Sequence, residues 1–148
     1  MLWRQRLSNI HKKVKSMKVL TIKEPFASLI KDKKKYIETR SWKTKYRGEL
    51  YIHAGKSIYK KISTDKTYLE LISTTKTNPG KIICKCNLKD CVYMTKEFIE
   101  EIKKNNYQEY ILGDYQEGRY AWILSDIVPQ KDQIEAKGKL NIWNYEEG

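Results

Sequence analysis

Short segments with β-strand patterns alternate with single helical segments along this chain, and this order restricts the folds that it can adopt. The strand patterns cover residues 17–22, 36–42, 49–54, 81–92, 118–124 and 137–145, and the helical patterns cover 25–34, 57–72, a segment from 95 onward and a turn at 109–112. Strands separated by one helix or one turn favour a mixed sheet curled into a small barrel. The alternation is too irregular for a doubly wound parallel sheet. We therefore expect an α+β fold, a small mixed β-barrel flanked by helices.

Several residues indicate where these elements begin and end. Pro25 suits the start of a helix, because its missing N–H costs nothing there, and Thr95 suits an N-cap. Residues 64 and 65 are expected to weaken the helical pattern over 57–72 and could divide it in two. The strand over 81–92 is expected to bulge near Asp90, and Pro129 is expected to end the extension of the strand over 118–124.

The length and the cysteines restrict the class of protein. A chain of 148 residues suits one domain with an ordinary hydrophobic core, and 40% hydrophobic against 32% charged residues predicts a folded chain. Cys84, Cys86 and Cys91 are too few and too closely spaced for a disulfide framework or a tetrahedral zinc set, so we expect free thiols and no metal. No segment reaches the ~20 apolar residues of a membrane span, and no signal peptide is apparent. The sequence thus predicts a cytoplasmic protein without a membrane partner.

The charge of the chain is strongly positive, at +12. The first sixteen residues carry five basic residues and no acidic one, and the rest still carries 25 basic against 18 acidic residues. Such an excess favours polyanions, because phosphates release counterions on binding. A lysine-rich composition that only keeps the surface solvated explains the same numbers. We divide the chain into a basic arm or appendage, 1–16, and a domain, 17–148.

The strand pattern over 36–42 is chemically unusual. Alternate residues of a strand share a face, so Tyr36, Glu38, Arg40 and Trp42 point one way. An exposed Glu38–Arg40 pair would be worth less than ~1 kcal/mol and would have no function. The alternative is a wall of a ligand site, since arginine presents a planar fork to a phosphate or a base edge and tryptophan offers a stacking face.

The segments EPFASLI (24–30), KK (34–35), IETRSW (37–42), RG (47–48), IHA (52–54), GRYAWIL (118–124) and GKLNIWNY (138–145) together resemble the ASCH domain, a family of the PUA-like superfamily. The resemblance covers nearly all of 18–146. The sequence departs from the family pattern at Asp32 and Lys33, where a glycine often precedes the lysine pair.

This resemblance implies a PUA-like barrel with a cleft between the barrel and the first helix. It implies that RNA, single-stranded nucleic acid or a modified nucleoside binds in this cleft, without a cofactor. The ligand-binding residues that it implies are Arg40, Trp42, Ser41, Tyr36, Arg47 and, with less weight, His53. The oligomeric state does not follow from the sequence.

A small branch of the family hydrolyses N4-acylated cytidines with a lysine, a threonine and a distant glutamate, in the local motif Lys-x-x-Thr-x-Arg. The matching positions are Lys35, Glu38 and Arg40, so glutamate replaces threonine. Glu109, Asp114 and Glu117 are the candidates for the distant acid. A neighbouring carboxylate favours charged Lys35, whereas Glu38 could itself act as a base toward water. A catalytic role for Lys35 and Glu38 is therefore the alternative to a binding protein.

Overall fold

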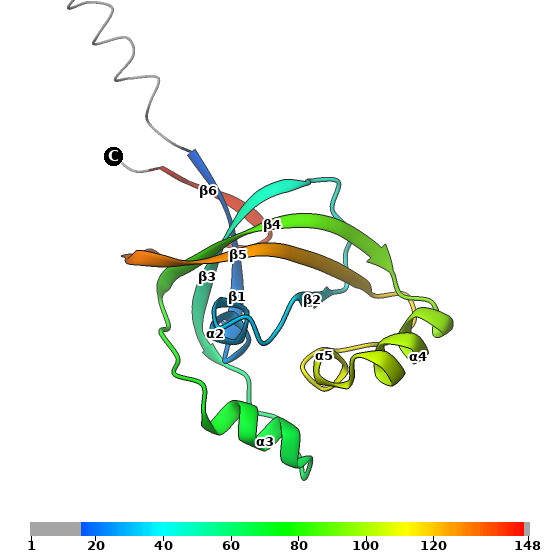
Figure 1. Cartoon of the computed structure of the whole chain (residues 1–148). Helices are drawn as coiled ribbons and strands as arrows, with labels where there is room; N and C mark the ends of the chain where they lie inside the picture. The colour runs from blue at the N-terminus through cyan, green and yellow to red at the C-terminus, as the bar shows by residue number, and fades with distance from the viewer. Residues whose placement is uncertain (1–15, 147–148) are drawn as a thin grey trace, which may run out of the picture.

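The computed structural model describes residues 16–146, which form six strands and four helices (Figure 1). The strands are β1 (Ser16–Glu24), β2 (Ile37–Arg40), β3 (Gly48–Ile58), β4 (Lys81–Tyr93), β5 (Tyr120–Glu135) and β6 (Ile142–Glu146). The helices are α2 (Phe26–Lys31), α3 (Lys66–Ser73), α4 (Lys96–Asn105) and α5 (Tyr107–Ile111). Of the predicted basic arm, only Ser16 lies within the described residues, and it begins β1.

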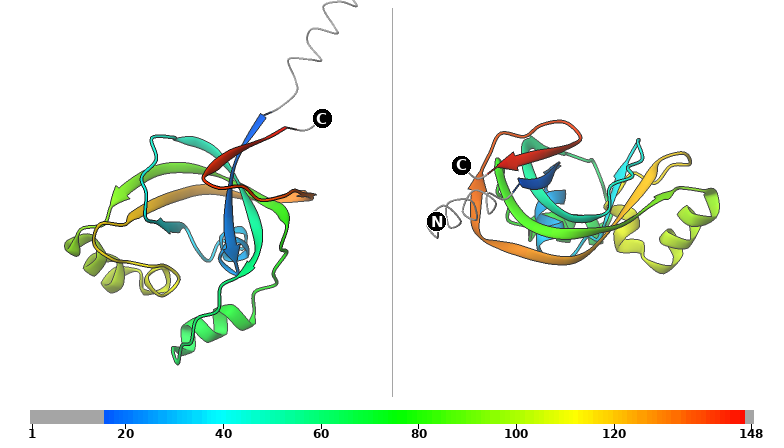
Figure 2. Two further views of the ribbon diagram at one scale, coloured as in Figure 1. Left: turned by 180° about the vertical axis from the view of Figure 1, so that it is seen from behind. Right: turned by 90° about the horizontal axis from the view of Figure 1, so that it is seen from above.

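The six described strands belong to one sheet, in the order β2-β5-β4-β3-β1-β6. β1 and β3 run parallel, and all other neighbours run antiparallel. The sheet curls strongly, as the view from above shows (Figure 2), but β2 and β6 stay at opposite edges without pairing. The predicted α+β class and mixed sheet are confirmed, whereas the term barrel fits only loosely because the sheet does not close.

The hydrophobic core fills the concave side of this sheet. Its main cluster combines alternate residues of β1, β3, β4 and β5, such as Leu20, Ile52 and Trp122. Helix α2 contributes Ala27 and Ile30 to this cluster and packs against all four of these strands. The predicted helix start is confirmed, since α2 begins directly after Pro25. Burial of its apolar face therefore fixes α2 beside the end of β1.

Three boundaries predicted from the sequence are wrong. Pro129 lies inside β5, opposite Cys84, where the register of β4 and β5 shifts, and such an irregularity tolerates a residue without an N–H. The helix expected from residue 57 begins only at Lys66, and β3 extends to Ile58 instead. The expected division at residues 64 and 65 is confirmed, because the Asp65 side chain accepts a hydrogen bond from Tyr68 N and caps α3. Residues 137–141 form a loop, and β6 starts at Ile142.

Other local predictions are confirmed. Thr95 caps α4 and accepts a hydrogen bond from Phe98 N. The register of β4 shifts between Leu88 and Asp90, as the expected bulge requires. Cys84, Cys86 and Cys91 are free thiols, and burial raises the pKa of Cys84 and that of Cys86, the latter to about 12. These two thiols are therefore protonated and unreactive at neutral pH.

Candidate functional site

A cleft of about 1280 Å³ lies where β1 runs past the end of its pairing with β6. Thr21, Ile22 and Lys23 of β1 line it on one side. Residues 38–42, from β2 and the turn that follows, line it on another side. The cleft also reaches Phe26 of α2 and the segment 111–114 that follows α5. It therefore occupies the open seam of the curled sheet.

Arg40 bridges this seam. Its Nη2 donates a hydrogen bond to the carbonyl oxygen of Thr21 over 2.8 Å, and the same group lies 3.0 Å from Glu38 Oε2. The Arg40 Nε donates to the same carboxylate oxygen over 3.1 Å. Glu38 is 7% exposed, so the pair is shielded from solvent more than a surface pair would be. The same-face prediction for Glu38 and Arg40 thus yields an ion pair on the cleft wall.

Lys35 and Glu109 form a buried pair of charges behind this wall. Lys35 is 1% exposed and its Nζ donates to the Ile37 carbonyl oxygen, while Glu109 is 2% exposed and accepts from the backbone N–H groups of Tyr36 and Ile37. Burial lowers the pKa of Lys35, although Glu38 and Glu109 oppose this shift. Burial raises the pKa of Glu109, against the opposing effect of Lys35. The two groups therefore stabilise each other's charge in a poorly solvated place.

The Tyr115 ring packs above Gly113 and beside this pair. A Cβ at Gly113 would come within 2.7 Å of Tyr115 Cε2 and 2.9 Å of Thr39 Cγ2, so only glycine leaves room for the ring. The Tyr115 hydroxyl oxygen is buried and has no hydrogen-bond partner among the described residues. Burial raises the pKa of Tyr115, and Glu109 and Glu38 raise it further. A polar hydroxyl thus lies close to both carboxylates without being bonded to either.

Aromatic side chains face the cleft from two sides. Trp42 is held edge-on against the buried Trp122, with ring centroids 4.6 Å apart, and its carbonyl accepts from Trp122 Nε1. Tyr59 is 43% exposed and its ring centroid lies 5.2 Å from that of Phe26. These rings offer apolar faces to a ligand at two places in the cleft.

His53 anchors the loop 136–141 to the cleft. Its Nε2 lies 2.7 Å from the Ala136 carbonyl oxygen, which can only accept, so Nε2 carries the hydrogen. Its Nδ1 lies 3.2 Å from Thr21 Oγ1, and this oxygen also accepts from Trp143 Nε1 over 3.0 Å. A Cβ at Gly138 would approach Thr21 and His53 within 3.2 Å. The loop is therefore seated closely on β1 and β3.

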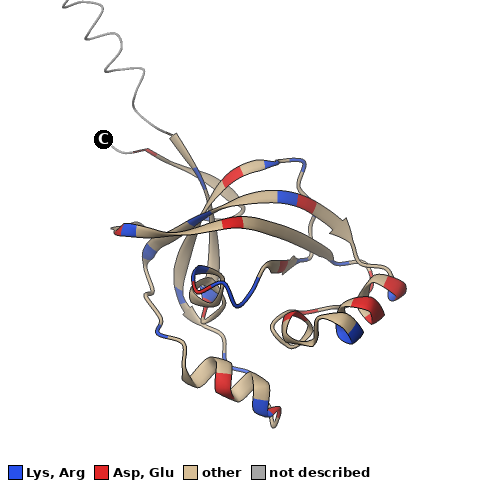
Figure 3. Cartoon of the chain, viewed as in Figure 1, with Lys and Arg blue, Asp and Glu red and all other residues tan. Residues whose placement is uncertain are grey.

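Basic residues outnumber acidic residues along the cleft. Lys and Arg occur on strands, helices and loops alike (Figure 3). Two arginines, Arg40 and Arg119, line the cleft together with the six lysines Lys23, Lys56, Lys61, Lys81, Lys137 and Lys139. Three acidic residues, Glu38, Asp114 and Glu135, line it as well. The cleft therefore attracts anions.

The structure brings most of the predicted site residues to the cleft. Glu38, Arg40, Ser41, Trp42 and His53 line it. Lys35 lies directly behind the wall, and of the three candidates for the distant acid only Glu109 belongs to the same charge cluster; Asp114 instead lines the cleft and pairs with Arg119.

Two predicted residues lie elsewhere. Tyr36 is 41% exposed and does not line the cleft. Arg47 lies before β3, where its Nη2 is 3.5 Å from Asp90 Oδ1. β2 begins at Ile37 and ends at Arg40, so the expected strand alternation includes neither Tyr36 nor Trp42.

Sequence reasoning did not identify several residues that build the site. Thr21 is a polar residue between the buried Leu20 and Ile22 of β1, and this contrast was a usable signal. Gly113 and Gly138 lie where a Cβ would collide with the cleft residues, but glycine in a loop is too common to indicate this. The six lysines of the cleft come from distant parts of the chain and only the fold brings them together.

Comparison with known proteins identifies the family. The model of the ASCH domain matches residues 20–132, which is more than half of the chain. The chain belongs to the ASCH domain family. A comparison with curated protein sequences gives no match.

Solved structures of ASCH proteins share this fold. The ASCH protein of Zymomonas mobilis superposes with a TM-score of 0.53 at 18% sequence identity, covering 80% of this chain and 73% of the other. A tyrosine-to-phenylalanine variant of the Z. mobilis protein gives a TM-score of 0.49 at 18% identity, covering 76% of this chain and 71% of the other. None of the helices within residues 16–146 is long and apolar enough to cross a membrane.

Proposed function

We propose that this protein binds RNA or a nucleotide in the cleft between the curled sheet and α2. The observation that carries the proposal is the composition of the cleft, which eight basic and three acidic residues line together with the half-buried ring of Trp42 and the exposed ring of Tyr59. Phosphates are attracted by the positive potential, and bases stack on aromatic side chains.

The test is binding of a labelled single-stranded RNA to the full chain, measured by fluorescence anisotropy at several salt concentrations. The logarithm of the affinity should fall linearly with the logarithm of the salt concentration. Replacing Tyr59 or Trp42 by Ala should weaken binding by roughly 1–3 kcal/mol for each base that no longer stacks. Arg40→Ala should weaken binding to a similar extent, because it removes a charged hydrogen-bond donor.

Matched control variants lie outside the cleft. Tyr93 is 54% exposed and is the control for Tyr59, and Arg47 is the control for Arg40. Circular dichroism establishes that each variant is folded. Binding that does not depend on salt, or that survives Tyr59→Ala, Trp42→Ala and Arg40→Ala unchanged, contradicts the proposal.

A second candidate function is hydrolysis of an N4-acylated cytidine or a related nucleoside. The observation that favours it is Lys35, whose pKa burial lowers while the carboxylates of Glu38 and Glu109 oppose this shift. Glu38 lines the cleft and could take the proton of a water that attacks the acyl carbon. The Lys35 amine itself is buried and bonded to a carbonyl, so a direct role for it requires movement of the wall.

The second candidate is tested by incubating the protein with N4-acetylcytidine and measuring cytidine by chromatography. In this case Lys35→Ala and Glu38→Gln should each reduce the rate by about 10²-fold or more, the scale of a positioned acid–base group. Glu117→Gln, at an exposed position outside the cleft, is the control. No turnover, or turnover that persists in both variants, excludes these roles.

A further inference from the structure

We propose that the cleft holds a single-stranded polynucleotide whose phosphates follow one side of the cleft, the lysine wall, rather than an isolated nucleotide. The lysine wall is formed by Lys23, Lys56, Lys61, Lys81, Lys137 and Lys139. This inference rests on the proposed function and identifies the class of ligand and its orientation.

The positive charges of the cleft differ in whether they are neutralised. Arg40 lies 3.0 Å from Glu38, and Arg119 Nε lies 3.5 Å from Asp114. In contrast, the side chains of the six wall lysines form no ion pair and no hydrogen bond within residues 16–146, although Lys61 Nζ lies 5.1 Å from the centroid of the Tyr68 ring. All six are exposed or half-buried. Glu135, the third acidic residue of the cleft, lies opposite Lys81 in the pairing of β4 with β5. Six lysines against this one carboxylate leave the net positive charge on the lysine wall, and this side of the cleft is where phosphates bind most favourably.

Four lysines of the wall, Lys56, Lys81, Lys137 and Lys139, come from separate segments that lie next to one another. Lys56 of β3 and Gly80, which precedes β4, lie side by side, since a Cβ at Gly80 would be 3.6 Å from Lys56 Cε. The Gly80 carbonyl accepts from Ala136 N over 3.1 Å, and this hydrogen bond places the loop 136–141 next to them. Lys137 and Lys139 thus continue the row that Lys56 and Lys81 begin.

The loop that carries Lys137 and Lys139 is held in place rather than free. His53 Nε2 donates to the Ala136 carbonyl, and Gly138 fits against Thr21 and His53. The Lys139 Nζ lies 5.8 Å from the centroid of the Trp143 ring. The two ammonium groups are therefore presented at a preformed surface, which lowers the entropy cost of binding.

The extent of the lysine wall decides between a nucleotide and a strand. Its lysines come from β1, β3, the segment after β3, β4 and the loop before β6, so a single phosphate group cannot contact all of them. The cleft volume of about 1280 Å³ also exceeds the ~300–1,000 Å³ of typical small-molecule pockets. Trp42 and Tyr59 line the same cleft, and stacking of the bases of a strand on these rings requires unpaired bases. A single strand is therefore the ligand that fits.

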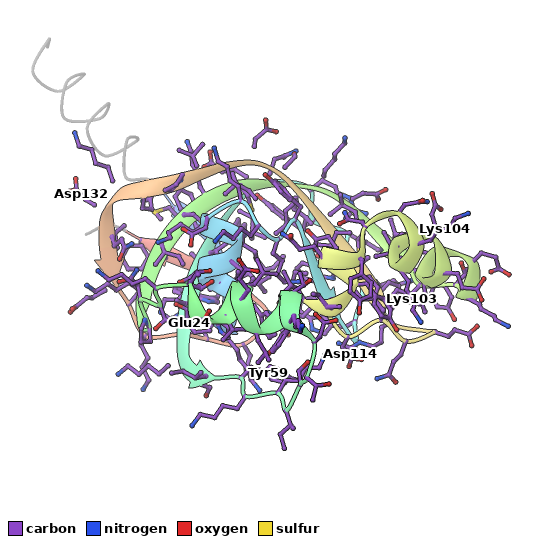
Figure 4. The ribbon with its side chains drawn as sticks, turned by 60° about the horizontal axis from the view of Figure 1, so that its bottom comes forward. Glu24, Tyr59, Lys103, Lys104, Asp114 and Asp132 are labelled. Atoms are coloured by element: carbon purple, nitrogen blue, oxygen red, sulfur yellow. The ribbon has the colours of Figure 1, made fainter. Side chains whose placement is uncertain are left out.

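The test compares two double variants of the full chain in the anisotropy assay, with an RNA about 12 nucleotides long. In the first, Lys137 and Lys139 are replaced by Ala. In the matched control, Lys103 and Lys104 of α4 are replaced by Ala; Figure 4 shows both on α4, away from Tyr59 at the cleft. The slope of the logarithm of the affinity against the logarithm of the salt concentration should become shallower by about 1.4 in the first variant, which is about 0.7 for each lost phosphate contact. The control variant should keep the wild-type slope.

Competition with uridine monophosphate tests whether the cleft prefers a strand to an isolated nucleotide. The mononucleotide should displace the strand only at a concentration at least ~10²-fold above that of unlabelled strand, because linked contacts raise the overall affinity. Equal competition by the mononucleotide, equal slopes in the two double variants, tighter binding of a duplex, or preferential binding to phosphatidylserine vesicles would each overturn the inference. If binding of the strand and binding of the mononucleotide both stay unchanged when Tyr59, Trp42 or Arg40 is replaced by Ala, the proposed function itself fails. Failure of the inference and failure of the proposed function are therefore distinguishable.

Discussion

At the scale of single residues, the side chains of three glutamates and one lysine are almost completely removed from water within residues 16–146. Glu24, Lys35, Glu38 and Glu109 are between 0% and 7% exposed. A charge in such a place is costly unless hydrogen bonds and opposite charges compensate it. Here each carboxylate accepts hydrogen bonds from backbone or side-chain groups, and Lys35 interacts electrostatically with Glu38 and Glu109.

The pH dependence of stability should report on Glu109. Burial raises the pKa of Glu109 above its ordinary value of 4.5, so the folded protein binds a proton more tightly than the unfolded chain does. Its contribution to stability is therefore fully present below about pH 4.5 and is lost as the pH rises through the raised pKa. The melting temperature of the wild type relative to Glu109→Gln should fall as the pH rises from about 4 to about 7.

Calorimetry across this pH range, with Glu117→Gln as the control for loss of one exposed carboxylate, measures the effect. An advantage of the wild type over Glu109→Gln that grows with pH would mean that the N–H groups of Tyr36 and Ile37 and the charge of Lys35 outweigh burial.

The Tyr115 hydroxyl leads to a second prediction at this scale. A buried hydroxyl without a partner costs about 1–3 kcal/mol, and the Tyr115 oxygen has none among the described residues. Tyr115→Phe should therefore raise the free energy of unfolding by roughly 1 kcal/mol in urea denaturation. Tyr107→Phe is the matched control and should not stabilise the protein, because the Tyr107 hydroxyl donates to Asp65 Oδ2 over 2.7 Å. Destabilisation by Tyr115→Phe would show that this hydroxyl does have a partner, such as a water molecule.

At the scale of elements, one carboxylate joins β1, α2 and the turn before β4. Glu24 Oε1 accepts from Ser28 N over 2.8 Å, and Oε2 accepts from Ser28 Oγ over 2.6 Å and from Asn78 N over 2.7 Å. Glu24 is fully buried. The first turn of α2 and the chain entering β4 are thus fixed to the end of the strand that borders the cleft.

Removal of this carboxylate should weaken all three connections together. Hydrogen bonds to a charged group are worth about 1.5–3 kcal/mol each, and buried N–H groups left without an acceptor add to the loss. Glu24→Ala should therefore lower the free energy of unfolding by at least about 3 kcal/mol. Ser28→Ala removes one of the three bonds and should cost about 1 kcal/mol. Chemical denaturation of both variants measures the difference, and equal losses would contradict the joint role of Glu24.

The elements themselves could largely be predicted from the sequence, because their signals are local. The alternation of residues 81–92 and the capping residue Thr95 correspond to β4 and α4. The errors lie where interactions distant in sequence decide. Pro129 continues a strand because β4 and β5 shift their register there, and residues 137–141 leave the strand because His53 and Gly80 bind the backbone of Ala136.

The candidate site was partly predictable, because some of its residues are close together in the sequence. Glu38, Arg40 and Trp42 occur in one short segment, so their common place could be derived from the sequence. The lysine wall could not, since its members span residues 23 to 139 and meet only through the order of the strands. Glu109 joins Lys35 from far along the chain, and here the sequence offered three candidates without a means of choosing among them.

At the scale of the whole molecule, the sheet is a curled layer with an open seam. Backbone hydrogen bonds connect β2 to β6 through the other strands, but across the seam the structure relies on a side chain, Arg40, bonded to the Thr21 carbonyl. The seam is therefore at once the gap that keeps the sheet from closing and the place where the cleft forms.

The boundary of the domain leads to the last prediction. Met17 is 3% exposed and pairs with Tyr145 of β6, and Ser16 precedes it as the first residue of β1. A chain that begins at Met17 keeps every residue of the hydrophobic core, so its melting temperature should be unchanged within error. A chain in which the initiating Met replaces Lys18 is the contrasting variant and should melt at a lower temperature, since nothing occupies the place of the buried Met17 side chain. Calorimetry on the three chains measures this, and a loss of cooperative unfolding in the chain from Met17 would make the first sixteen residues part of the domain.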